Sequence, residues 1–105
     1  MPSRRERIEA MLADEPGDSF LRYSLALELD KEGEHEHSLE MLRGLMDDSP
    51  AYVPAFFMSA QQLARLARID EARAVLRVGI EQARQFGDTH AAGEMSEFLA
   101  TLGSL

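Results

Sequence analysis

Apolar residues recur along this chain three and four positions apart, the spacing of a helix, and no stretch alternates apolar and polar residues as a strand does. Proline, glycine or a capping residue separates one apolar stretch from the next. The pattern therefore predicts an all-helical protein of about six helices. The predicted helices cover residues 3–13, 19–32, 35–47, 54–66, 69–86 and 89–102.

Local signals indicate where several of these helices begin and end. Ser3 and Glu6 have the spacing of a capping box. Asp18 and Asp88 are suited to accept hydrogen bonds from the first turn of the helices that follow them. Gly33 supplies the left-handed conformation with which many helices end.

The helical pattern repeats along the chain with a fixed period of 34 residues, the distance from residue 19 to residue 53. When residue 19 is set beside residue 53, Ala26 matches Ala60 and Leu42 matches Leu76. Ile8 lies one period before Leu42, so half a unit precedes the first full one. A fixed period of this length, with helical spacing inside it, is typical of stacked pairs of helices.

We expect one domain, residues 1–105, made of a half-repeat helix, two repeats and a capping helix. These units span residues 3–16, 19–52, 53–86 and 88–105. The last helix is apolar on one side, with Met95 and Phe98, and polar on the other, with Glu94 and Glu97. A half-polar end helix covers apolar surface that the last repeat would otherwise expose.

The net charge of −8 argues against a nucleic acid or an anionic membrane as partner, because both require a basic face. The charge is unevenly distributed along this acidic chain. Residues 14–48 carry eleven acids and three bases, whereas residues 49–85 carry five arginines and three acids. Two solvated faces are the simpler interpretation, and head-to-tail attraction between molecules is the alternative.

The chain has no cysteine, which excludes disulfides, thiolate metal sites and cysteine nucleophiles. A reducing cytoplasm is the expected location. No apolar run approaches the roughly 20 residues of a membrane span, and the N-terminus lacks the apolar segment of a secretory signal.

Candidate chemistry is sparse. His35 and His37 are two residues apart and diverge on a helix, whereas His90 and Glu94 share a face but are only two ligands. The chain contains no nucleophile elbow, phosphate-binding glycine loop or zinc-protease motif. We therefore expect no catalytic, metal-binding or cofactor-binding residues, and no enzymatic activity.

Small residues, prolines and one aromatic at fixed places in the unit resemble those of the tetratricopeptide repeat. The matching residues are Ala26, Ala60, Gly33, Ala67, Ser38, Ala72, Pro16, Pro50 and Phe56. Three residues depart from the pattern: Arg22 replaces a bulky aromatic, Ser59 a leucine and Arg84 the junction proline. The resemblance implies a right-handed superhelix of antiparallel helix pairs.

In that family, the first helices of successive repeats line a concave groove that takes up an extended peptide or a partner helix. The resemblance implies that nine residues line it here: Phe20, Tyr23, Leu27, Asp30, Lys31, Phe57, Gln61, Ala64 and Arg65. One subset of the family binds terminal carboxylates through lysines and asparagines, but this chain has no asparagine. Tyr23, Leu27, Phe57 and Gln61 stand at the corresponding inner face, so we expect an apolar groove instead of a carboxylate clamp.

The sequence thus predicts a non-enzymatic module that binds a protein or peptide partner of unknown identity. The alternative is a structural module that forms a homodimer through the same groove. A concentration-independent monomer near 11.7 kDa would favour the external partner, and a stable dimer would favour self-association.

Overall fold

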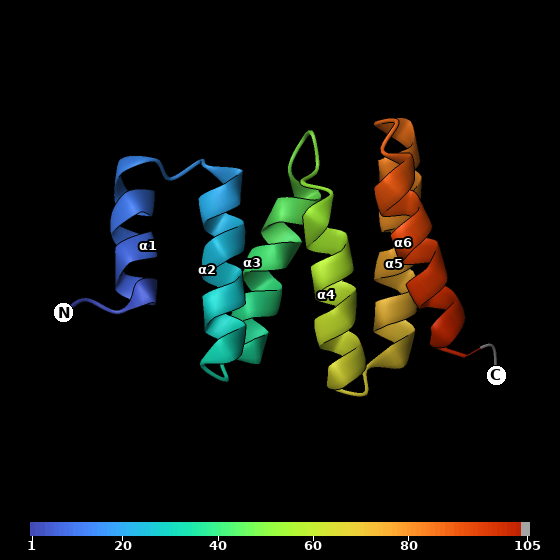
Figure 1. Ribbon diagram of the computed structural model, residues 1–105, viewed down its shortest axis with the longest axis horizontal. Coiled ribbons are helices and arrows are strands. Elements are labelled where there is room, and N and C mark those ends of the chain that lie inside the picture. The colour runs from blue at the N-terminus through green and yellow to red at the C-terminus, as the bar shows by residue number, and fades with distance from the viewer. Residues whose placement is uncertain (104–105) are drawn as a thin grey trace.

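The computed structural model describes residues 1–103, which form six helices and no strand (Figure 1). The helices are α1 (Arg4–Asp14), α2 (Ser19–Lys31), α3 (His35–Asp47), α4 (Pro54–Arg65), α5 (Ile69–Gln85) and α6 (Thr89–Thr101). The predicted all-helical fold is confirmed, and every predicted helix end lies within one residue of the observed one. Residues 104 and 105, at the end of the predicted capping unit, lie outside the described residues.

Each helix packs against the helix that follows it in the chain, and the result is an elongated stack of 47 × 30 × 19 Å. Figure 1 shows the stack running from α1 at the N-terminal end to α5 and α6 at the other end. The apolar core is divided into three clusters along this axis. They are centred on Ile8 and Leu29, on Leu42 and Leu45, and on the larger set around Leu76.

The predicted caps are present. The hydroxyl of Ser3 accepts a hydrogen bond from the backbone N–H of Glu6 at 3.1 Å, and the Glu6 carboxylate accepts one from the Ser3 N–H at 2.9 Å. The carboxylates of Asp18 and Asp88 accept hydrogen bonds from the first turns of α2 and α6. Gly33, which follows α2, has a φ of +85°, the left-handed conformation that glycine adopts without strain.

Small side chains lie where helices approach one another most closely. The buried Ser38 hydroxyl of α3 donates a hydrogen bond to the carbonyl oxygen of Ala26 in α2 at 2.6 Å. At Gly79 of α5, an added Cβ would lie 2.5 Å from the Cβ of Phe56 and 2.7 Å from the Sδ of Met95. The helices α4, α5 and α6 therefore meet at a position that has room only for a hydrogen atom.

Arg22, which stands where the resemblance places an aromatic side chain, bridges α2 and the end of α3. Its Nη1 lies 2.6 Å from the Oδ2 of Asp48. A Cβ added at Gly44 would lie 3.2 Å from the Arg22 Nη2, so the guanidinium lies close to the α3 backbone. A long side chain that packs its stem and pairs its charged end thus occupies this position.

We predict that Gly79→Ala lowers the free energy of unfolding by about 1–3 kcal/mol, because the new methyl group overpacks the junction of three helices. Gly93→Ala is the matched control, since it makes the same change within α6 where no atom lies within 4 Å of the new Cβ. The control should raise stability by up to about 1 kcal/mol through helix propensity. Chemical denaturation measures both, and equal effects would contradict the close approach at Gly79.

A second prediction concerns Gln62, which is 1% exposed in α4. Neither its Nε2 nor its Oε1 has a hydrogen-bond partner among residues 1–103. Because an unpaired buried amide is costly, Gln62→Met should raise the free energy of unfolding by about 1–3 kcal/mol at nearly constant volume. Denaturation of the variant beside the wild type tests this, and a loss of stability would indicate that the amide has a partner such as a buried water.

Candidate functional site

A hollow of about 260 Å³ lies on the face formed by α2, α4 and α6, which we call the α2/α4/α6 face. Apolar side chains make up much of its wall, and polar ones from α4 and α6 lie among them. The lining residues are Tyr23, Val53, Pro54, Phe57, Met58, Gln61, Asp88, His90, Ala91, Glu94 and Met95. A concave surface with a mainly apolar lining and a few polar groups is the usual form of a binding site.

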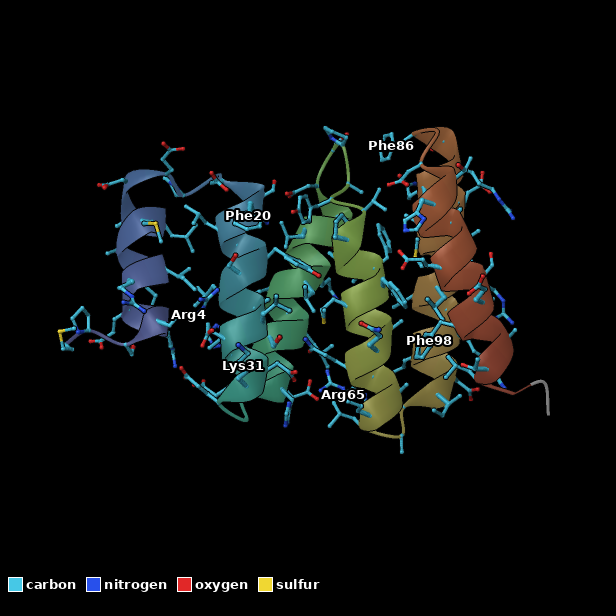
Figure 2. The ribbon with its side chains drawn as sticks, viewed as in Figure 1. Arg4, Phe20, Lys31, Arg65, Phe86 and Phe98 are labelled. Carbon is cyan, nitrogen blue, oxygen red and sulfur yellow. The ribbon has the colours of Figure 1, made fainter. Side chains whose placement is uncertain are left out.

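Two aromatic pairs hold the walls of this hollow in place. The ring of Tyr23 lies 5.5 Å from that of Tyr52, which precedes α4, at an interplanar angle of 56°. Phe57 of α4 meets Phe98 of α6 edge to face, with ring centroids 5.7 Å apart. Figure 2 shows Phe98 between α6 and α4. Such contacts favour one arrangement of the rings and so limit movement of the lining.

Burial alters the acidity of Tyr23. Removal of its hydroxyl from water raises the pKa of Tyr23 above 10.0, and the neighbouring Tyr52 raises it further. The phenol therefore stays neutral over a wider range of pH in the folded chain than in the unfolded one. A neutral hydroxyl on an apolar wall can donate or accept one hydrogen bond with a ligand.

Three of the nine predicted groove residues line this hollow: Tyr23, Phe57 and Gln61. Phe20 is 64% exposed near the start of α2, as Figure 2 shows, and does not line it. Leu27 and Ala64 are half-buried and are also outside the lining.

The remaining three predicted groove residues, Asp30, Lys31 and Arg65, form ion pairs within the chain. The Nη2 of Arg65 lies 3.1 Å from the Oδ2 of Asp30, and the Nδ1 of His35 lies 2.7 Å from the other carboxylate oxygen. These contacts join the ends of α2 and α4 to the start of α3. The Nζ of Lys31 lies 3.5 Å from Glu28, whose Oε1 also pairs with Arg4 of α1 at 2.7 Å. Asp30 and Arg65 thus neutralise each other. Lys31 and Arg4 of α1 pair with the same carboxylate, that of Glu28.

The groove predicted from the sequence did not include α6, which was expected to act only as a cap, although α6 supplies the hollow with His90, Ala91, Glu94 and Met95. A signal for this was present. Ala91 lies one repeat period after Phe57, and Met95 lies one period after Gln61. The period therefore continues into α6 at two of the four positions that line the hollow.

No group of three or more His, Asp or Glu side chains within residues 1–103 is placed to hold a metal ion. The Nε2 of His90 lies 3.4 Å from the Oε1 of Glu94, a pair at the edge of the hollow. None of the helices in the described part of the chain is long and apolar enough to cross a membrane.

Comparison with known proteins identifies the fold. No family model and no curated protein matches the chain. The solution structure of a tetratricopeptide repeat domain protein from Salinibacter ruber is 30% identical to this chain, with a TM-score of 0.79, and the match covers 86% of this chain and 91% of that one. A protein from Bordetella parapertussis is 28% identical over 97% of this chain and 89% of that one, with a TM-score of 0.80. This chain belongs to the tetratricopeptide repeat family.

Alkaline titration tests the environment of Tyr23. In Tyr52→Phe, Tyr23 is the single remaining tyrosine, and we predict that its absorbance titrates with a midpoint above 10 when the protein is folded. Because the pKa of Tyr23 is higher in the folded chain, its ionisation does not affect the free energy of unfolding below the unfolded pKa. The free energy of unfolding then falls as the pH rises from the unfolded pKa through the folded pKa. Denaturant should return the midpoint to about 10. An ordinary midpoint in the folded variant would mean that the hydroxyl is solvated.

Proposed function

We propose that this protein is a non-enzymatic interaction module that binds an apolar segment of a partner protein in the hollow on the α2/α4/α6 face. The observation that carries the proposal is the joint lining by Tyr23, Phe57 and Met95, which come from three different helices. Tyrosine and other aromatic side chains provide large contact areas and are enriched among residues that dominate binding energies.

The family supports this proposal in general terms. The tetratricopeptide repeat fold serves as a scaffold for protein–protein interaction, and such scaffolds are generally not enzymes. The hollow has the size to take one or two side chains of a partner, and Gln61, His90 and Glu94 offer hydrogen bonds beside the apolar wall. A short segment with an aliphatic or aromatic anchor is the ligand that fits this chemistry.

Selection from a displayed peptide library tests the proposal without knowledge of the natural partner. Selected peptides should share an apolar anchor, and Gln61→Arg should weaken their binding at least about tenfold, because the larger charged side chain occupies the space that the anchor needs. Ala100→Arg is the control, because it adds an arginine at an exposed position of α6 that does not line the hollow. Its binding should equal that of the wild type.

Two outcomes would contradict the proposal. Peptides that bind both variants equally would show that the hollow is not their site. A change in solution mass caused by Gln61→Arg alone would instead favour the homodimer that uses the same face. Circular dichroism of each variant serves as the folding control.

A further inference from the structure

A second hollow lies between α3 and α5, with α4 as its floor. Its volume is about 400 Å³, and a more open hollow of about 580 Å³ continues it toward the loop before α4 and the end of α5. The two share Met46, Asp47, Phe56 and Val78, so they form one continuous depression, which we call the α3/α5 groove. None of the nine groove residues predicted from the sequence lines it.

Comparison of the two repeats explains why this groove is open. The residue one period before Ser59 is Leu25, which packs with Ile8 of α1 in a buried cluster. The residue one period before Val75 is Met41, which packs against the same cluster. Ser59 and Val75 are smaller, so the space that Leu25 and Met41 fill in the first unit is left unfilled in the second.

Exposed apolar side chains border the groove. Val78 is 53% exposed and Phe86 is 49% exposed, and both belong to the wall that α5 and its C-terminal end provide. The floor beneath them contains Phe56 and Leu63. Exposed apolar surface that continues into an apolar depression usually marks an interaction surface.

The rim of the groove has an excess of acids, with Glu36, Glu40, Asp47 and Glu71 against Arg43 and Arg68. Arg68 pairs with both Glu36 and Glu71. The hydrogen bond from Arg68 lowers the pKa of the Glu71 carboxyl, and the charge of Arg43 contributes to the same shift. Arg68 is thus compensated by two acids. On α3, Glu40, Arg43 and Asp47 are exposed and form no ion pair within residues 1–103, which leaves two acids against one base on this side of the rim.

The opposite charge lies on the outer flank of α5. Arg77 and Arg84 are exposed and form no ion pair in the described part of the chain. They are seven residues apart and so share one flank of the helix, whereas Val75 and Gln82 face the groove on the other flank. Glu40 and Asp47 of α3 have the same spacing of seven residues, about 10 Å along a helix.

We propose that the α3/α5 groove is an interface between two copies of this chain, with α5 of each copy lying in the groove of the other. Val78 then covers the space above Ser59 of the other copy, and the arginine pair of α5 meets Glu40 and Asp47. Each copy supplies both the acidic rim and the basic flank, as a two-fold interface requires. The hollow on the α2/α4/α6 face takes no part, so this proposal and the proposed function can fail independently.

Sedimentation equilibrium tests the interface on the full chain. The wild type should show a reversible dimer that weakens as salt is added, because its charged contacts are exposed and are screened. Two variants reverse one side of the charge pattern each: Glu40→Lys with Asp47→Lys, and Arg77→Glu with Arg84→Glu. Either variant alone should associate at least about tenfold more weakly than the wild type, because like charges then face each other.

A mixture of the two variants provides the decisive measurement. In the mixed dimer, the lysines of one chain face the glutamates of the other, and the unchanged acids face the unchanged arginines. Association should therefore return in the mixture alone, which also shows that both variants are folded. Val78→Asp is a further variant at an exposed position and should give a monomer, while Gln61→Arg on the other face should leave the dimer intact.

Three results would overturn the proposal. The first is a wild type that remains monomeric at every concentration at which it stays in solution. The second is a dimer that both charge variants retain. The third is a monomer that binds a helical peptide of leucine and lysine through the groove, which would assign the groove to a basic helix of another protein.

Discussion

No helix of this protein can bury its apolar stripe alone, and the stack depends on the burial of each stripe against a neighbouring helix. Close approach is therefore needed at a few points. Ala26, Ala60 and Ala72 are fully buried, and Gly79 has room only for hydrogen between α4 and α6. These positions set the distance between helices, and that distance in turn decides which side chains can reach across a face.

The helices were predictable because their signals are local. The capping box at Ser3 and the left-handed turn at Gly33 act within a few residues, and each predicted helix end lies within one residue of the observed one. The candidate site was only partly predictable, because it depends on contacts between distant residues. The resemblance to the tetratricopeptide repeat placed Asp30 and Arg65 in the groove, but it could not show that their side chains meet each other. The contribution of α6 to the hollow could have been predicted from the sequence only because the repeat period continues to Ala91 and Met95.

The same repeat produces two different surfaces, because equivalent positions carry side chains of different size. Leu25 fills its place between α1 and α3, whereas Ser59 leaves the equivalent place between α3 and α5 open. The resemblance to the family marks Ser59 only as a residue that replaces the usual leucine. That this replacement leaves a hollow between α3 and α5 follows from the residues that surround Ser59 in the structure. Substitutions inside a repeat can therefore create a binding surface while the backbone is unchanged.

The attachment of α1 has a consequence for the dynamics of the chain. Ile8 is the one buried residue that α1 contributes within the described residues, and Leu12 packs beside it only partly buried. Ion pairs from Arg4 to Glu28 and from Arg5 to Glu32 and Glu34 supply further contacts to α2 and the turn after it. Ion pairs of this kind add little stability, so α1 opens at a much lower free energy than the centre of the stack. Fraying of α1 exposes Leu25 and Leu29 but leaves α4, α5 and α6 packed. Local unfolding of α1 therefore leaves in place the parts of the hollow that α4 and α6 provide, while it removes a packing neighbour of α2, the helix that carries Tyr23.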